Sequence, residues 1–332
     1  MKITGSYPKT RLRRLRKTTW MRALVAENNI SHNDLILPIF VRDGRNKIET
    51  IKSMPGIKRY TVDKLPKILK EVKKYKIPMV ALFPYTPNGK KDNLGSEALN
   101  PNNLICKSIK LIKKKFPEIG VMCDVALDPY TSHGHDGIMI RGKIENDKTN
   151  EILVKQALLQ ARMGCDVIAP SDMMDGRVGA IRKALDKEKF FDVSILSYAV
   201  KYASNYYGPF RDAVGSLSKL KQDKKTYQMD YRNQLEAYRE VGLDIKEGAD
   251  MVMVKPGMFY LDIINNIKKN FKIPVIVYQV SGEYILIKNA IDKKLLNENS
   301  IIESIISFKR AGASAIITYF AIEIAKKIKK IN

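Results

Sequence analysis

The chain has few cysteines and no long apolar run. Its three cysteines, Cys106, Cys123 and Cys165, lie far apart in the sequence, and no Cys-x-x-Cys pair occurs. Isolated cysteines of this kind indicate reduced, buried thiols instead of a disulfide framework or a redox motif. No run of about eighteen apolar residues is present, and a polar, basic stretch follows Met1 where a signal peptide would have an apolar core. These absences exclude a membrane span and predict a cytoplasmic protein.

Acidic residues are scarce relative to basic ones. The 332 residues include 59 Lys and Arg against 35 Asp and Glu, a formal net charge of +24. Such a charge suits a nucleic-acid-binding protein, because Lys and Arg neutralise phosphates. Most lysines, however, are scattered through segments of helical periodicity such as 64–76 and 107–115, and no base-reading element is recognisable. We therefore expect a solvated, lysine-rich surface and no nucleic-acid partner.

Short apolar runs recur along the chain with helical segments between them. There are eight such runs, at residues 35–41, 79–84, 121–127, 166–169, 193–198, 251–254, 275–279 and 315–319. Buried parallel strands have this composition. The intervening segments place apolar residues at helical spacing, as in 63–76, 103–116, 151–163, 233–247, 261–270 and 301–311. Eight strand–helix units predict an α/β fold of the (β/α)₈ TIM-barrel type.

Two segments fall outside this repeat. Residues 1–34 are too short for a domain, so we divide the chain into an N-terminal arm, 1–34, and a catalytic barrel, 35–332. The arm is either a frayed tail or a subunit-packing arm, because Trp20 and its leucines require burial somewhere. The stretch 202–229 is much longer than an ordinary loop, which predicts a functional lid or a largely disordered segment.

Polar residues follow most of the predicted strands, where α/β barrels collect their chemical groups. Two of them are lysines: Lys255 closes the run 251–254, and Lys201 follows the neighbouring run. Burial and a like charge nearby both lower a lysine pKa, and a neutral amine is a nucleophile toward carbonyl groups. The alternative for each is an exposed loop lysine. We predict that both form Schiff bases.

The third run leads into a dense cluster of oxygen and imidazole groups, CDVALDPYTSHGHDG at 123–137. Asp128 and Asp136 suit magnesium or another hard cation, and the absence of a second nearby thiolate argues against a tight zinc site. His133 and His135 are either metal ligands or hydrogen-bonding residues of a glycine-hinged loop, and the sequence leaves both readings open.

At these residues the sequence closely resembles the porphobilinogen synthases, also called 5-aminolevulinate dehydratases. The segments that carry the resemblance are SYAVKYAS at 197–204, YGPFR at 207–211, MVKPG at 253–257, YQVSGEY at 278–284 and KRAGA at 309–313. The resemblance implies a lyase that condenses two 5-aminolevulinate molecules into porphobilinogen with loss of two waters, in haem and tetrapyrrole biosynthesis. It also implies that Lys255 binds the substrate of the propionate side and Lys201 that of the acetate side.

The same resemblance implies roles for further residues. Ser281 and Tyr319 would hold one substrate carboxylate, and Arg211 and Lys224 the other. Gln228 would assist at the second carboxylate, and Asp124 and Ser171 would orient the substrate amine. Taken alone, Tyr319 is equally a barrel-core residue, and Lys224 equally a solvated loop charge.

The resemblance is to the aspartate-rich, zinc-independent kind. Ala126, Asp128 and Asp136 stand where zinc-dependent members carry cysteines. The resemblance implies a magnesium or monovalent ion at Asp128 and Asp136, or catalysis with no active-site metal, and no zinc. A separate allosteric magnesium maps onto Glu240, which otherwise is an ordinary helical acid. The arm is similar to one that wraps a neighbouring subunit in a homo-octamer.

The sequence leaves two rival functions open. A lysine aldolase on the same barrel would need one essential lysine, whereas the pair Lys201 and Lys255 requires two. A basic nucleic-acid-binding protein would use the run 11–17 and the long loop, and its affinity would fall steeply with ionic strength.

Overall fold

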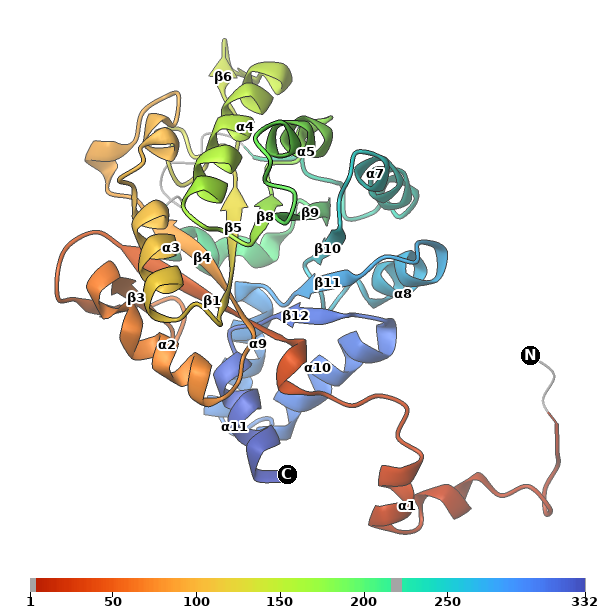
Figure 1. The fold of residues 1–332 in the computed structure, drawn as a ribbon. Helices are drawn as coiled ribbons and strands as arrows, with labels where there is room; N and C mark the ends of the chain where they lie inside the picture. The colour runs from red at the N-terminus through yellow and green to blue at the C-terminus, as the bar shows by residue number, and fades with distance from the viewer. Residues whose placement is uncertain (1–3, 216–222, 332) are drawn as a thin grey trace.

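The computed structural model describes residues 4–215 and 223–331, and its centre is a closed barrel of parallel strands (Figure 1). Each barrel strand pairs with its neighbours in chain order, and β12 pairs with β1 to close the ring. The eight strands of the barrel are β1 (Leu35–Arg42), β4 (Met79–Tyr85), β5 (Gly120–Val125), β8 (Val167–Pro170), β9 (Ser194–Lys201), β10 (Met251–Lys255), β11 (Val275–Tyr278) and β12 (Ala315–Ile317). The predicted (β/α)₈ barrel is confirmed.

Amphipathic helices surround the barrel. In α2 (Leu65–Lys74), for example, Leu65, Leu69 and Val72 are buried at helical spacing while lysines occupy the outer face. Side-chain caps and glycines set several ends: the Asn103 side chain caps α3 (Leu104–Lys115), and Gly312 ends α10 (Asn299–Ala311) with a φ of 114°. The remaining helices of the ring are α4 (Asn146–Arg162), α5 (Arg177–Lys187), α7 (Leu235–Lys246), α8 (Leu261–Asn270), α9 (Ser281–Asp292) and α11 (Ala321–Ile331).

Two short hairpins and several single turns add to the ring. The strands β2 (Ile48–Thr50) and β3 (Lys58–Thr61) pair with each other, and β3 also pairs with the end of β1. The strands β6 (Met139–Ile140) and β7 (Lys143–Ile144) form a separate antiparallel pair. Turns of 3₁₀-helix occur at η3 (Val62–Lys64), η4 (Asn88–Lys90) and η5 (Ser96–Leu99).

The register between β9 and β10 contains a β-bulge. Ser197 faces Val252 and Val200 faces Val254, so that Tyr198 and Ala199 together stand opposite Met253 alone. One extra residue on one strand reverses the alternation of side chains beyond it. On the carboxyl-terminal side of the bulge, the last residue pair of the two strands is Lys201 opposite Lys255.

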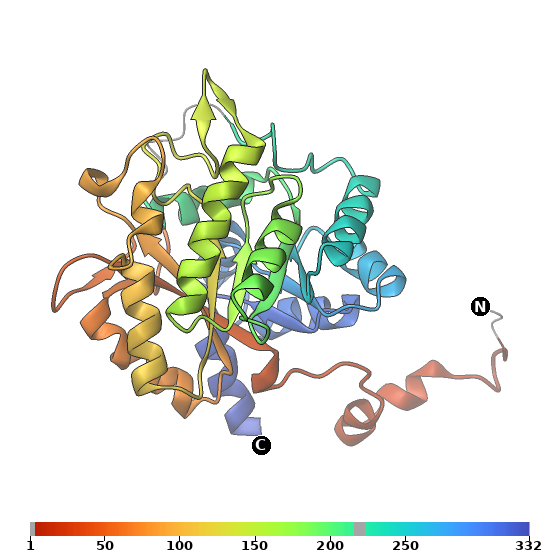
Figure 2. The ribbon, with the colours of Figure 1, turned by 45° about the horizontal axis from the view of Figure 1, so that its top comes forward.

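The N-terminal arm projects away from the barrel in both views (Figures 1 and 2). It contains η1 (Leu12–Arg16) and α1 (Thr19–Leu24), and the Thr18 side chain caps α1. Its large apolar side chains are exposed, among them Trp20 at 65% and Leu24 at 74%. The arm meets the barrel at η2 (His32–Asp34), where Asp34 forms an ion pair with Lys309 at 2.7 Å.

The long loop predicted as a lid begins and ends at the barrel. Its two ends are joined because Met229 N donates to Lys201 O at 3.0 Å and Ala203 N donates to Met229 O at 2.8 Å. The loop contains η6 (Asn205–Tyr207) and α6 (Gly208–Ala213). Its middle part, residues 216–222, lies outside the described residues. In the described parts of the chain, none of the helices has the length and apolar character needed to span a bilayer.

Candidate active site

A narrow cavity lies at the carboxyl-terminal end of the barrel, under the loop that carries α6. Its volume is about 40 Å³, far below the roughly 300 Å³ at which pockets for small molecules begin. Most of the residues singled out in the sequence line it: Asp124, Ala126, Asp128, Asp136, Ser171, Lys201, Arg211, Lys224, Gln228 and Lys255. The described conformation is therefore a closed one that has gathered the predicted groups.

The two lysines are the last residues of adjacent strands. Lys201 and Lys255 are partners in the β9–β10 register, so both side chains lie on the inner face of the barrel. Lys201 is 6% exposed and Lys255 is 5% exposed. Neither is the exposed loop lysine that the sequence left open, and a substrate carbonyl in this cavity would meet both amines.

The Lys255 amine lies among aromatic rings. Its Nζ is 4.6 Å from the centroid of the Tyr278 ring, 5.0 Å from Tyr198, 5.1 Å from Phe210 and 5.4 Å from Tyr207. Burial, reinforced by the charge of Lys201, lowers the pKa of Lys255 to about 7. A large fraction of this amine is neutral and nucleophilic near neutral pH.

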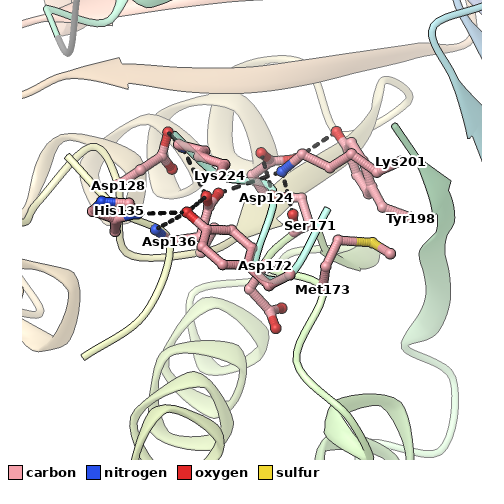
Figure 3. A network of polar contacts seen from close by, with 12 residues as sticks. Asp124, Asp128, His135, Asp136, Ser171, Asp172, Met173, Tyr198, Lys201 and Lys224 are labelled. Carbon is pink, nitrogen blue, oxygen red and sulfur yellow. Dashed lines mark hydrogen bonds and ion pairs between the residues drawn. The ribbon is translucent and has the colours of Figure 1, made fainter. Parts of the chain in front are cut away.

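Polar groups surround the Lys201 amine. Its Nζ donates to the carbonyl oxygen of Ser171 and lies 3.3 Å from Asp136 Oδ1. Figure 3 shows Lys201 and Ser171 turned toward the two aspartates, Asp124 and Asp136. The two lysines therefore differ in environment, which a reaction that treats two substrate molecules differently requires.

Asp124 has two hydrogen-bond donors. Tyr198 Oη donates to Asp124 Oδ1 at 2.6 Å, and Ser171 Oγ donates to Asp124 Oδ2 at 2.9 Å. Burial raises the pKa of Asp124, while the charge of Lys255 and the Tyr198 hydrogen bond act in the opposite direction. The structure thus brings Asp124 and Ser171 together beside the lysines.

Lys224 occupies the position between the two aspartates expected to bind a cation. Its Nζ is 2.7 Å from Asp136 Oδ2 and 3.3 Å from Asp128 Oδ2. Burial alone would raise the pKa of Asp136, but the ammonium groups of Lys201 and Lys224 hold it well below its usual range. The described residues contain no group of three or more His, Cys, Asp or Glu side chains placed to share one ion. A metal at Asp128 and Asp136 does not fit this arrangement, because the ammonium groups already balance the carboxylates.

The two histidines of the same loop have hydrogen-bonding contacts. His133 Nε2 lies 3.3 Å from the carbonyl oxygen of Asn93, and His135 Nδ1 lies 3.0 Å from Tyr227 Oη. Tyr227 Oη also donates to Asp136 Oδ2 at 2.9 Å. These contacts favour the structural reading of His133 and His135 over metal ligation.

The predicted carboxylate anchors fall into two groups. Arg211, Lys224 and Gln228 line the cavity, and the buried Oε1 of Gln228 has no hydrogen-bond partner among the described residues. Ser281 and Tyr319 are buried but are not among the described residues that line it. Tyr319 Oη is 3.0 Å from Tyr278 Oη, whose ring contacts Lys255, and Ser281 Oγ accepts from Phe210 N at 2.9 Å. Both therefore lie behind the aromatic rings around Lys255.

Glu240 lies outside this cavity. Its Oε1 accepts from Arg177 Nη1 at 2.6 Å, and Arg177 also pairs with Asp244 at 3.0 Å. Glu240 lines a second, larger cavity of about 570 Å³, together with Asp175 and Glu236.

Several residues of the site were assigned no role from the sequence, although three of them lie in its quoted motifs. Tyr198, Tyr207 and Phe210 surround Lys255, and Tyr227 joins the long loop to Asp136. All four lie within or next to segments that also contain Lys201, Arg211 or Lys224. A search for aromatic residues close in sequence to the predicted lysines would have identified them.

Comparisons with known proteins identify the family to which the chain is similar. Residues 9–327 match the family described as delta-aminolevulinic acid dehydratase. The delta-aminolevulinic acid dehydratase of Bradyrhizobium diazoefficiens is 56% identical over 320 residues, covering 96% of this chain and 91% of that protein. That of Methanothermus sociabilis is 51% identical, covering 97% and 99%. A crystal structure of the Toxoplasma gondii delta-aminolevulinic acid dehydratase (porphobilinogen synthase) with its reaction product porphobilinogen has a TM-score of 0.94 at 47% identity, covering 96% of this chain and 91% of that one.

Proposed function

Because this chain belongs to the delta-aminolevulinic acid dehydratase family, a family of lyases, we propose that it condenses two 5-aminolevulinate molecules into porphobilinogen with loss of two waters. This reaction is a step toward haem and other tetrapyrroles. The observation that carries the proposal is the pair of buried amines, Lys201 and Lys255, side by side at the end of two adjacent strands.

Lys255 acts first as a nucleophile in this proposal. Its neutral Nζ attacks the ketone carbon of one substrate, and the resulting carbinolamine loses its hydroxyl group as water to give an imine. Protonation of the imine nitrogen makes an electron sink, so a proton on the neighbouring carbon becomes acidic. The aromatic rings around Nζ favour both the neutral amine, by excluding water, and the later iminium cation, by cation–π attraction.

Lys201 activates the second substrate in the same way. Its amine forms the imine of the acetate-side molecule, while Lys255 holds the propionate-side molecule. A carbon–carbon bond forms when the deprotonated carbon of the Lys201-bound molecule attacks the imine carbon of the Lys255-bound molecule. The amino group of the Lys255-bound molecule then closes the ring on the other imine carbon and displaces the Lys201 amine, and the Lys255 amine leaves by elimination with loss of a ring proton. Each imine releases one water when it forms, so displacement of the lysines without rehydration accounts for the two waters lost.

The carboxylates of the two substrates require separate anchors. Arg211 and Lys224 supply cationic groups to the cavity that Lys201 also lines, and Gln228 Oε1, which has no hydrogen-bond partner among the described residues, is available to a ligand donor. Ser281 and Tyr319 supply hydroxyl groups on the Lys255 side, behind the aromatic rings. Asp124 and Ser171 lie where a substrate ammonium group would meet a carboxylate and a hydroxyl.

Binding of two substrates requires the long loop to move. The present cavity of about 40 Å³ cannot hold them, and a substrate carboxylate must take Lys224 away from Asp128 and Asp136. The Lys224 part of the loop is joined to the barrel by these ion pairs and can leave with that lysine, whereas α6 packs through Phe210 on Phe40 and Phe83 of the barrel strands.

We also propose the two assembly features expected from the sequence. A magnesium ion that keeps most of its waters would bind at Glu240, in the cavity that Asp175 and Glu236 also line. The exposed arm would pack on a neighbouring subunit of a homo-octamer. Magnesium added to metal-free wild type should favour the larger assembly in sedimentation velocity, and Glu240→Gln should abolish that response; an equal response in the two proteins would refute the site.

The proposed reaction is tested by trapping. Wild type, Lys201→Ala and Lys255→Ala are incubated with 5-aminolevulinate and borohydride, adducts are mapped by mass spectrometry, and porphobilinogen is detected colorimetrically. Lys115→Ala, an exposed lysine at the end of α3, is the control. We expect an adduct at Lys255 and loss of product in both active-site variants, with the control unchanged. Loss of product in only one variant would show that one lysine suffices and overturn the two-lysine mechanism, whereas no adduct with no product would reject the proposal and reopen the aldolase alternative.

A further inference from the structure

We propose that Tyr198 is a positioning residue for this reaction, whose ring contacts both lysine amines and whose hydroxyl orients the Asp124 carboxylate toward them. The inference rests on the proposed function and adds to it a residue to which the sequence motifs assign no role. Three observations carry it: the contacts of Tyr198, the backbone that places it, and the charges around Asp124.

Tyr198 contacts both lysines and Asp124. The centroid of its ring is 5.0 Å from Lys255 Nζ and 5.9 Å from Lys201 Nζ. Its hydroxyl donates to Asp124 Oδ1 at 2.6 Å (Figure 3). The side chain is fully buried, so water does not compete for this hydrogen bond. The ring therefore contacts both amines, while the hydroxyl fixes the carboxylate that both of them face.

The β-bulge of β9 is what allows Tyr198 and Lys201 to share the inner face. In a regular strand, residues three apart point to opposite faces of the sheet. Ser197 contacts Arg177 and Asp244 on the helix side, so Tyr198 points inward, and the regular alternation would turn Lys201 outward. The extra residue at 198–199 restores Lys201 to the inner face. Bulges are rare between parallel strands and are enriched beside active sites, where they redirect a side chain.

Asp124 needs a second donor besides Ser171 to hold one orientation. A carboxylate can rotate about its last bond, and Ser171 Oγ fixes one oxygen only. The Tyr198 hydroxyl fixes the other and, because burial and the neighbouring Asp124 raise its pKa well above its usual value, it remains a donor throughout the working pH range. The pair of donors keeps Asp124 turned toward the space between the amines.

The hydroxyl also favours the ionised form of Asp124. A donor to a carboxylate lowers its pKa, so removal of this donor raises the pKa of Asp124 further above its usual value. The acid side of the pH–rate profile should then move to higher pH. The titratable and charged groups that face Asp124 from the surrounding elements are Lys255, Tyr198, Lys201, Tyr278 and Tyr319.

Tyr198→Phe tests this role because it keeps the ring and removes the hydroxyl. Tyr202→Phe is the matched control: Tyr202 is also fully buried near the end of β9, and its hydroxyl donates to the carbonyl oxygen of Asn233, away from the lysines. We expect Tyr198→Phe to lower kcat about tenfold to a hundredfold, to change KM little, and to move the acid limb of kcat to higher pH. Tyr202→Phe should retain the kcat and the pH profile of wild type.

Each outcome has one meaning. Wild type that forms no porphobilinogen overturns the proposed function and not the position of Tyr198. Active wild type with Tyr198→Phe matching Tyr202→Phe in kcat and pH profile overturns the present inference. If Tyr198→Phe melts far below Tyr202→Phe, 3-fluorotyrosine in place of Tyr198 provides the second test. Its stronger donor should move the acid limb to lower pH, and an unchanged limb would overturn the inference.

Discussion

The lowered pKa of Lys255 follows from where its ammonium group would have to lie. Aromatic rings replace water around Nζ, and Lys201 places a like charge on the adjacent strand. Both effects favour the neutral amine. Chemistry at Lys255 should therefore depend on pH across the neutral range, with the neutral, reactive form gaining as the pH rises through about 7.

Removal of the Lys201 charge should shift that dependence. In Lys201→Met the like charge is gone, so the pKa of Lys255 should rise and its reaction with a ketone should need a higher pH. The measurement is the initial rate of borohydride trapping of levulinate at Lys255, between about pH 5.5 and 9, with adducts mapped by mass. The rate should fall about tenfold per pH unit well below the pKa. The control is Lys246→Met, which removes an exposed lysine. If the trapping rate depends on pH identically in Lys201→Met and Lys246→Met, the charge of Lys201 does not lower the pKa of Lys255.

At the residue scale the sequence identified the lysines but not their surroundings. Lys201 and Lys255 end apolar runs, so their place at the mouth of the barrel followed from strand position alone. The ammonium group found between Asp128 and Asp136 could not be predicted, because Lys224 is distant in sequence and its ion pairs exist only in the folded chain. Carboxylates in a sequence indicate negative charge and say nothing of the partner that balances it.

At the scale of elements, the β2–β3 hairpin supports the helix that carries Arg211 and Phe210. Arg59 of β3 is 6% exposed, and it donates to the carbonyl oxygens of Ala213 at 2.7 Å and Asp212 at 2.8 Å, at the end of α6. It also pairs with Glu49 of β2. The hairpin thus holds the C-terminal end of α6 from outside the site.

Arg59→Lys should loosen α6 without touching the lysines. A lysine cannot reproduce the forked guanidinium contacts, and each lost hydrogen bond from a charged donor costs about 1.5–3 kcal/mol. We expect KM for 5-aminolevulinate to rise about tenfold or more, while levulinate trapping at Lys255 persists. Lys58→Ala, exposed on the same strand, is the control. A KM equal to that of wild type would show that α6 is held by other contacts.

The strands show what periodicity can and cannot predict. All eight barrel strands were found as apolar runs, because a parallel strand buried on both faces has no polar side to interrupt it. The strands of the β2–β3 hairpin are short and partly exposed, so they leave no such run. Three helices of the ring, α5, α9 and α11, were also not identified. The bulge in β9 depends on the pairing with β10, which a single strand does not encode.

At the scale of the whole molecule, the N-terminal arm has large apolar side chains that a single chain leaves exposed. Trp20 and Leu24 are 65% and 74% exposed on a segment that projects from the barrel (Figure 2). Exposed apolar side chains gathered on one extended segment are typical of a surface that packs on a partner. The homo-octamer stays a prediction, and the arm is where it can be tested.

The double variant Trp20→Ser, Leu24→Ser should reduce self-association and leave the barrel intact. Burial of these side chains in an interface would contribute several kcal/mol, about 1.5–3 kcal/mol for each large apolar group. Sedimentation velocity should show smaller species, and the far-ultraviolet circular dichroism should be unchanged. Leu295→Ser is the control, since Leu295 is 74% exposed on the barrel itself. A variant that sediments like wild type would exclude the arm as the main contact.

The bulge in β9 divides the kinds of mutation that this strand can accept. A substitution at Ala199 keeps the number of residues in the bulge, so Lys201 still pairs with Lys255. An insertion of one residue between Ser197 and Val200 would either enlarge the bulge or shift Lys201 out of register with Lys255, and the shift would turn the lysine toward the helices. Over evolutionary time this short stretch should thus resist insertions, whereas the hairpin of β6 and β7 lies outside the barrel and can lengthen without moving either lysine.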